Sequence, residues 1–233
     1  MNIFINQPWG LGDIIYCQTL ANDWIAEGHK VTWGIFPQFV EQCNRAYPNV
    51  AFVDWRSVKI DYDRMDEHDS FGYRVVPLRH NVEIMNVPYS ECMRSKYTMF
   101  NHDFNRWKEG AMWVRDERKE RDLYLLTDAF IHKGKGYNLI NETFGSQSQL
   151  KANMYVNNGC HNIYMSTIGK YSLFDWALII ENASEIHTVS SSILYILEML
   201  DLKQPIHLYD RKPIEKGFAN VDYLFTKPYI LHS

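Results

Sequence analysis

The 233-residue sequence lacks several features that would decide its class at once. No apolar run approaches the roughly 20 residues that a membrane-spanning helix needs, and the first residues lack the basic stretch of a secretion signal. Basic residues are not in excess, since 24 Lys and Arg face 28 Asp and Glu, for a formal net charge of -4. We therefore expect a cytoplasmic protein without a membrane span, and one that does not bind nucleic acid through bulk positive charge.

Cysteine is scarce, and the four that occur are scattered: Cys17, Cys43, Cys92 and Cys160. They form no C-x-x-C pair and no spacing typical of a zinc site, so we expect reduced thiols in a reducing compartment. Asp61-Tyr62-Asp63 has the D-x-D form of a metal-binding motif, but it lies within an acidic stretch that is typical of a solvated loop. We therefore predict neither a bound metal nor another cofactor.

What the sequence does contain is an alternation of strands and helices. Hydrophobic residues make up 46% of it and aromatic residues 15%, which suits a well-packed globular protein. The first part predicts strands at 2–7, 29–36 and 51–55 and helices at 14–28 and 36–47, the second ending before Pro48. Gly28 lies where the C-cap glycine of the first helix is expected. This order, with short links, indicates a parallel α/β sheet with right-handed crossovers.

The first strand leads into the first helix through Trp9-Gly10-Leu11-Gly12-Asp13. The glycines allow a sharp turn at the carboxyl end of a strand, where open α/β sheets gather their ligands. The spacing is not G-x-G-x-x-G, so it does not predict a dinucleotide site. Two interpretations of Asp13 stay open: a helix N-cap, or a catalytic base exposed at the ligand edge of the sheet.

A second α/β unit begins near residue 122. It predicts strands at 128–132, 161–165, 185–190 and 205–210, and helices at 172–183 and 191–202. Ser172 is the expected N-cap of the first of these helices. A charge-rich stretch at 117–123 separates the two parts. We therefore expect two Rossmann-like domains, 1–120 and 121–233.

One polar turn of the second part is basic. Lys133-Gly134-Lys135-Gly136 directly follows a predicted strand, and its lysines and backbone amides suit a phosphate group. A basic surface turn would have the same composition. His132 stands beside it at the strand end, either as part of the site or as a hydrogen-bonded structural residue.

A second polar turn is rich in hydroxyls. Ser190-Ser191-Ser192 lies between a predicted strand and a predicted helix, where hydroxyls and free amides form either an anion site or a simple N-cap. His187 precedes it, and a lone histidine is more often structural than catalytic. In the middle of the chain, basic residues could line a groove for an anionic acceptor: Arg94, Lys96, Arg106 and Arg115.

Three segments resemble one enzyme family. The segment GLGDIIYCQTLANDWIAEGHKVTWGIFPQF is similar to the opening of the ADP-heptose lipopolysaccharide heptosyltransferases, glycosyltransferase family 9-like enzymes. FIHKGKG is similar to the first strand and phosphate-binding turn of their nucleotide-side domain. STIGKYSLFDWALIIENASEIHTVSSSILYILEMLDLKQPIHLYD is similar to the later part of that domain. Together the segments cover about half of the chain in the family's order.

The resemblance implies a GT-B fold, in which two Rossmann-like domains face each other across a cleft. It also implies metal-independent transfer of a sugar from a nucleotide-sugar donor to a glycan or other hydroxyl acceptor. Asp13 would be the general base. Separately from the resemblance, Arg94 and Lys96 are the basic residues of the middle segment that we expect to bind the acceptor. The donor-binding residues would be Gly12, His132, Lys133 or Lys135, Gly169, Lys170, Ser190, Ser191 and Ser192.

The sequence departs from the family where Ser190-Ser191-Ser192 replaces an Asp-Thr-Gly turn at the donor phosphates. The serines keep hydroxyls and amides but lose the acid, so the donor sugar is not specified. Two alternatives remain: a non-catalytic nucleotide-sugar or glycan-binding module, and a nucleotide-sugar epimerase of the same architecture. The acid at Asp13 favours the transferase over the binder, because a binder needs no base.

Overall fold

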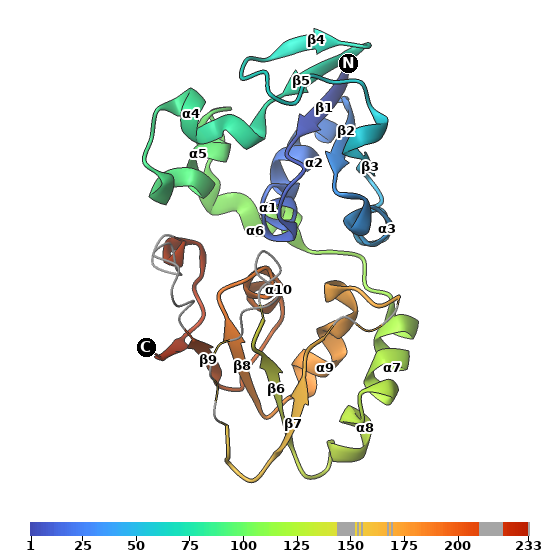
Figure 1. Cartoon of the computed structure of the whole chain (residues 1–233), viewed down its shortest axis with the longest axis vertical. Helices are drawn as coiled ribbons and strands as arrows, with labels where there is room; N and C mark the ends of the chain where they lie inside the picture. The colour runs from blue at the N-terminus through green and yellow to red at the C-terminus, as the bar shows by residue number, and fades with distance from the viewer. Residues whose placement is uncertain are drawn as a thin grey trace. The chain divides into compact units, whose positions relative to one another are not determined.

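The computed structural model describes residues 1–143, 152, 154, 156–166, 168, 170–209 and 221–232. The chain divides into two compact units, Met1–Val114 (unit 1) and Arg115–Ser233 (unit 2), which can be followed by colour in Figure 1. The division lies a few residues before the predicted boundary at 120. The reason is helix α7 (Glu117–Leu126), which packs on α9 (Ala177–Asn182) within unit 2.

Unit 1 is built on a five-stranded sheet in the order β3-β2-β1-β5-β4. Neighbouring strands are parallel except for β4 and β5, which are antiparallel. The strands are β1 (Asn2–Asn6), β2 (Lys30–Ile35), β3 (Ala51–Asp54), β4 (His68–Ser70) and β5 (Tyr73–Val76). The first three confirm the strands predicted from the sequence.

The helices of unit 1 follow the predicted alternation in its first half. They are α1 (Leu11–Tyr16), α2 (Gln18–Ala26), α3 (Pro37–Ala46), α4 (Asn81–Met85), α5 (Cys92–Thr98) and α6 (Trp107–Ala111). Short 3-10 turns lie between these elements and the strands: η1 (Trp55–Ser57), η2 (Leu78–His80), η3 (Tyr89–Glu91) and η4 (Phe104–Arg106). Gly28 ends α2 with a φ of 86°, as predicted, a backbone conformation that only glycine adopts at little cost.

Aromatic residues anchor the loop that carries the D-x-D sequence. Phe4 on β1 is fully buried and meets the rings of Tyr62 and Tyr73 edge to face. Tyr62 is therefore held against the sheet, while Asp61 and Asp63 on either side of it are exposed. This arrangement is the solvated acidic loop that the sequence predicts.

Unit 2 is built on a second five-stranded sheet, in the order β10-β9-β8-β6-β7, in which all neighbours are parallel. The strands are β6 (Tyr137–Asn141), β7 (His161–Tyr164), β8 (Glu185–Val189), β9 (Ile206–Tyr209) and β10 (Tyr229–His232). The other elements are α7, α8 (Ala129–His132), η6 (Leu173–Trp176), α9, α10 (Ile193–Met199) and η8 (Asp222–Leu224). The predicted strands at 161–165, 185–190 and 205–210 are confirmed over their described residues.

The predicted strand at 128–132 is wrong, because this segment forms helix α8. Its apolar residues Phe130 and Ile131 are 60% and 67% exposed, so they belong to no buried strand. The central strand is β6, which follows the basic turn and is buried along its whole length. A short apolar run such as 128–132 cannot be assigned to a strand or a helix by periodicity alone. In β6, the polar residue Asn138 interrupts the apolar run that would have indicated a buried strand. Its amide is hydrogen-bonded to the side chains of Asn158 and Asn162, which makes its burial tolerable.

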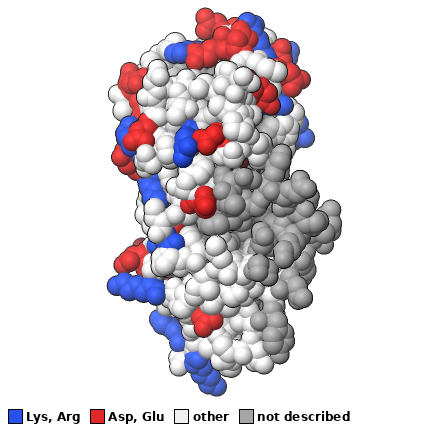
Figure 2. Space-filling view, turned by 90° about the vertical axis from the view of Figure 1, so that its left-hand side faces the viewer, with Lys and Arg blue, Asp and Glu red and all other residues white. Residues whose placement is uncertain are grey.

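The charges of the described surface are mixed. Figure 2 shows acidic and basic side chains lying beside one another on the face that it presents, rather than one continuous basic area. No helix among the described residues is both long enough and apolar enough to cross a bilayer. All four cysteines are free, as predicted.

Candidate functional site

Asp13 lies in the first turn of α1, just after the central strand β1 of unit 1. Gly10 is the N-cap residue, so the interpretation of Asp13 as the helix N-cap is wrong. Asp13 is instead the third residue of the helix, after Gly12, where free amides and the helix dipole still favour a carboxylate. Its side chain is 28% exposed, so the carboxylate can reach a substrate.

Gly10 allows the Asp13 carboxylate to fold back over the turn. Its backbone has a φ of 76°, in the region that side-chain-bearing residues rarely adopt. A Cβ at this position would also collide with Oδ2 of Asp13. The first glycine of the motif is therefore required by the position of the acid, three residues further on.

Lys96 on α5 meets Asp13 from the interior of unit 1. Its side chain is 2% exposed, and its Nζ lies 3.4 Å from Oδ1 of Asp13. The same ammonium donates to Oε1 of Gln7 at 3.0 Å, and lies 3.4 Å from the carbonyl of Leu78 and from Oδ1 of Asn81. Gln7 follows β1 directly, so the ammonium ties α5 to the turn that carries the acid.

The charge state of this pair follows from its surroundings. Burial opposes a charge on Lys96, but the neighbouring carboxylate of Asp13 favours it, and the pKa of Lys96 lies above its ordinary value. Burial raises the pKa of the Cys17 thiol, which therefore stays neutral at pH 7. The result is a partly exposed carboxylate held by a buried ammonium.

The other predicted groove cations are held by neighbours of opposite charge. Arg94 pairs with Glu91 at 2.9 Å and lies over the ring of Phe104 at 4.6 Å. Arg106 pairs with Asp23 and Glu109, and Arg115 with Glu120 and Glu181. Of the two predicted acceptor-binding residues, Lys96 therefore lies behind the acid rather than on an open surface, and Arg94 lies on α5 in a local ion pair.

Unit 2 has a pocket of about 200 Å³ at the carboxyl ends of β6, β7 and β8. The described residues that line it are uncharged and mix hydroxyl, amide, aromatic and aliphatic groups: Asn141, Thr143, Met165, Ser166, Tyr171, Ser172, Leu173, Trp176, Ser191, Ser192 and Ile193. Ser191 and Ser192 of the predicted triplet thus line the pocket. Ser190 is buried at the end of β8 and precedes them.

Asn141, which the sequence did not single out, organises the polar side of this pocket. It is the last residue of β6, and its amide donates to Oγ1 of Thr188 at 2.9 Å and to Oγ of Ser191 at 3.3 Å. Because Ser191 accepts this bond, its O–H can be donated to a ligand. Lys170, beside the pocket, is exposed, and its Nζ lies 5.9 Å from the ring centroid of Tyr171 in the pocket wall.

The basic turn lies at the amino ends of the strands, opposite the end that carries the pocket. Lys133 and Lys135 are exposed and precede β6, at the amino ends of the parallel strands. His132 stacks on His161 with ring centroids 3.8 Å apart, at that same end. The structure therefore does not bring these three predicted donor-binding residues together with the serines. Gly169 lies outside the described residues.

Comparison with known proteins indicates the fold but no family. The sequence matches no protein-family profile, and no curated protein matches it in sequence. The bacterial iron-containing dodecameric glycosyltransferase TibC from enterotoxigenic E. coli superposes with a TM-score of 0.51 at 13% identity. The alignment covers 90% of the present chain and 57% of TibC, so the chain spans little more than half of that protein.

A second solved structure, the E. coli heptosyltransferase WaaC with ADP, is 12% identical over the whole of this chain and 90% of its own. Its TM-score of 0.43 is too low to support an argument. The similarity to TibC confirms the predicted fold class, mixed α/β with two Rossmann-like units of the GT-B type. At this level of identity a likeness shows the fold alone, and the heptosyltransferase family stays a prediction.

Proposed function

We propose that the protein is a glycosyltransferase that moves a sugar from a nucleotide-sugar donor to an acceptor hydroxyl, with Asp13 as general base. The observation that carries this proposal is the pair of Asp13 and Lys96. It holds a partly exposed carboxylate at the carboxyl end of β1, whose neighbours β2 and β5 are parallel to it, against an ammonium that is itself buried. Ligands of open α/β sheets bind at this edge. TibC, a glycosyltransferase of similar fold, supports the reaction class.

The donor in this proposal binds in the pocket of unit 2. Among the described lining residues there is no carboxylate that would repel a diphosphate, and the hydroxyls of Ser191 and Ser192 lie beside the amide of Asn141. Tyr171 and Trp176 provide flat surface for a base or a sugar ring. Lys170, beside Tyr171 of the pocket wall, is a cation that can meet a phosphate.

The transfer needs no metal in this scheme. The acceptor oxygen attacks the anomeric carbon as Asp13 takes its proton, and the bond from that carbon to the diphosphate oxygen breaks. The nucleoside diphosphate leaves with the bonding electrons. Hydroxyls, amides and the nearby lysine stabilise its added charge. The ion pair with Lys96 keeps the Asp13 carboxylate in one orientation before the proton is transferred.

Donor binding can be tested by the rise in melting temperature that a panel of nucleotide sugars produces, since a ligand of the folded state stabilises it by mass action. Ser191→Ala removes one hydroxyl and should weaken the best donor about 2–10-fold, the equivalent of roughly 0.5–1.5 kcal/mol. Lys135→Ala is the matched control, because it lies at the opposite edge of the sheet and should leave donor affinity unchanged. Weakening by Lys135→Ala but not by Ser191→Ala would place the donor at the basic turn.

One observation favours a second candidate, a non-catalytic nucleotide-sugar or glycan-binding module. A buried ammonium needs a counter-charge, and Asp13 would serve Lys96 in that way even in a protein without catalysis. The two candidates differ in turnover, because a binder is stabilised by the donor but never releases nucleoside diphosphate. An epimerase would be recognised by conversion of the donor into an isomer with no acceptor present.

A further inference from the structure

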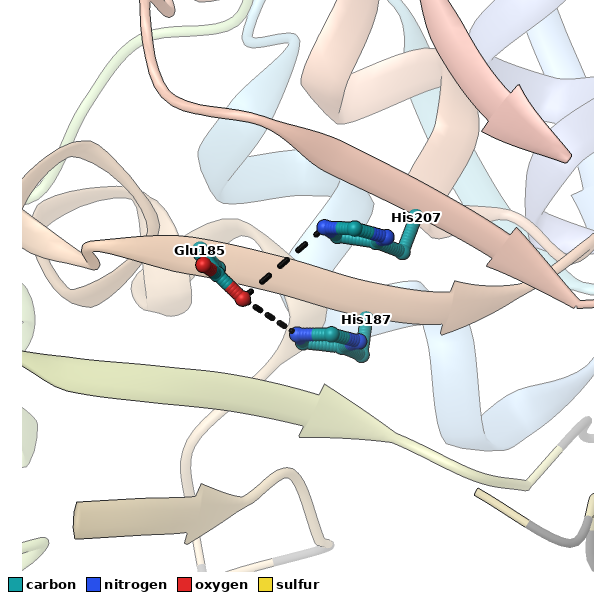
Figure 3. A group of neighbouring side chains, drawn as sticks. All are labelled: Glu185, His187 and His207. Carbon is teal, nitrogen blue, oxygen red and sulfur yellow. Dashed lines mark hydrogen bonds and ion pairs between the residues drawn. The ribbon is translucent and has the colours of Figure 1, made fainter. Parts of the chain in front are cut away.

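Within the described part of the chain, one group of side chains has the composition and spacing of a metal site. It consists of Glu185 and His187 on β8 and His207 on β9, and one ligand atom from each lies within 4.8 Å of the others. Figure 3 shows the two imidazole rings side by side on neighbouring strands, with the Glu185 carboxylate reaching toward both. We call these three residues the His-Glu cluster.

The sheet itself sets this arrangement. His187 and His207 are register partners on parallel strands, so their side chains leave the same face of the sheet. Glu185 is two residues before His187 on its strand, and therefore lies on that face as well. Because these positions are fixed by backbone pairing, the cluster does not depend on a loop conformation.

The distances suit a small transition-metal ion. Oε2 of Glu185 lies 3.1 Å from Nε2 of His187 and 3.8 Å from Nε2 of His207. Ligands at about 2.0–2.1 Å from a tetrahedral ion are about 3.3 Å from one another, which falls between the two values. The rings are stacked, with centroids 4.3 Å apart and planes at 5°, so each must turn slightly about χ2 to aim its lone pair at one ion. That torsion has broad wells in histidine.

The other ring nitrogen of each histidine already has a hydrogen-bond partner, as the second ring nitrogen of a metal-bound histidine does. Nδ1 of His187 lies 3.0 Å from the hydroxyl of Tyr209, and Nδ1 of His207 lies 2.8 Å from Nε2 of His232. With each Nδ1 protonated and donating to its partner, each Nε2 presents a lone pair to the carboxylate side. Such outer hydrogen bonds orient ligating histidines and fix their tautomer.

The charge of the cluster also favours a cation. Among the described residues, Glu185 forms ion-pair contacts with the rings of His187 and His207 and with no lysine or arginine. Its carboxylate, 29% exposed, therefore has no permanent cation among its described ion-pair contacts.

We propose that the His-Glu cluster binds one divalent transition-metal ion, with Zn²⁺ as the reference ion, through Glu185, His187 and His207. Two imidazoles and one carboxylate suit zinc and its neighbours better than magnesium or calcium, which prefer oxygen ligands. Three protein ligands leave a further position for water. The site lies on the face of the sheet opposite Asn141 and Thr188, since Thr188 is the next residue along β8 after His187. It is thus separate from the donor pocket.

The test is calorimetric titration of the full chain, stripped with a chelator, with Zn²⁺ and in parallel with Mg²⁺. We expect one Zn²⁺ per chain, a melting temperature that rises with Zn²⁺, and no such response to Mg²⁺. Glu185→Gln keeps the size of the side chain and its hydrogen bonds. Loss of a group that only hydrogen-bonds to a metal ligand typically weakens metal binding by roughly 10–100-fold, and Glu185→Gln, which changes a ligand itself, should weaken Zn²⁺ binding by more than this. Tyr209→Phe, which removes only an outer partner, should fall within that range.

His161→Gln is the matched control. His161 belongs to the other stacked histidine pair of unit 2, in which no carboxylate takes part among the described contacts, so this variant should bind Zn²⁺ as the wild type does. His207→Gln is a second variant in case Glu185→Gln does not fold. The proposal is overturned if the wild type takes up no Zn²⁺, or if folded Glu185→Gln and His161→Gln bind it equally well.

Discussion

The substitution Asp13→Asn affects both roles that the structure allows for this acid, catalytic base and counter-charge. It removes a basic carboxylate, and a positioned base typically contributes about 10²–10⁴-fold to a rate. It also removes the counter-charge of Lys96, an ammonium that is 2% exposed. Both effects should therefore appear in one variant, on transfer and on stability.

The expected loss of stability can be worked out from the contacts. Breaking a fully buried ion pair costs about 3–5 kcal/mol. Here the carboxylate is 28% exposed, and the ammonium keeps its bond to Gln7 at 3.0 Å, while the new Asn oxygen can still accept from it. We therefore expect a loss near that of one charged hydrogen bond, about 2 kcal/mol. For a chain of this size, that corresponds to a fall of roughly 4–8 °C in melting temperature.

The double variant Asp13→Asn with Lys96→Met distinguishes the roles. Methionine replaces the aliphatic stem of Lys96 but removes its unpaired charge, so the double variant should melt above Asp13→Asn alone. Transfer should stay as low as in the single variant, because the base is still missing. Turnover and melting are measured on the same purified samples. If transfer recovers together with the melting temperature, Asp13 is only a counter-ion for Lys96, and the base lies elsewhere.

Three further predictions use other features. Gly10→Ala should lower the melting temperature by the equivalent of about 1–3 kcal/mol and reduce transfer, because the backbone there is left-handed and a Cβ displaces the carboxylate of the proposed base; transfer at the wild-type rate would show that the acid need not lie over this glycine. Burial raises the pKa of the Cys17 and Cys43 thiols, so a thiol reagent at pH 8 should label partly exposed Cys160 well before either, and equal rates in the folded protein would contradict the burial. Turnover per folded molecule should be unchanged by a chelator. If the chelator abolishes turnover and added manganese or magnesium restores it, the exposed D-x-D loop becomes the candidate for a catalytic metal site.

Local patterns explain which parts of the fold could be predicted. The strand, turn and helix around Asp13 are encoded within about 25 neighbouring residues, through a buried apolar strand, two glycines and the C-cap at Gly28. Strand β6 could not be recognised in the same way, because Asn138 and Asn141 interrupt its apolar pattern. Their amides are satisfied by side chains 20 to 50 positions further along the chain.

The candidate sites depend even more on contacts between distant parts of the sequence. Lys96 looked like one basic residue among many on a mixed helix, and only the packing of α5 places it under Asp13. His187 and His207 are 20 positions apart, and their adjacency follows from the register of β8 and β9. A search for metal ligands that are close together in the sequence therefore does not find the His-Glu cluster. Asn141 would have been a candidate had 137–141 been recognised as a strand, because a polar residue at the carboxyl end of such a strand lies where ligands bind.

The most direct test of the proposed reaction is the release of nucleoside diphosphate from the nucleotide sugar that stabilises the protein best, measured with and without candidate hydroxyl acceptors. We predict that release depends on an acceptor and that Asp13→Asn lowers it by about 10²–10⁴-fold. Tight donor binding with no release under any acceptor, or conversion of the donor to an isomer with no release, would contradict a glycosyltransferase.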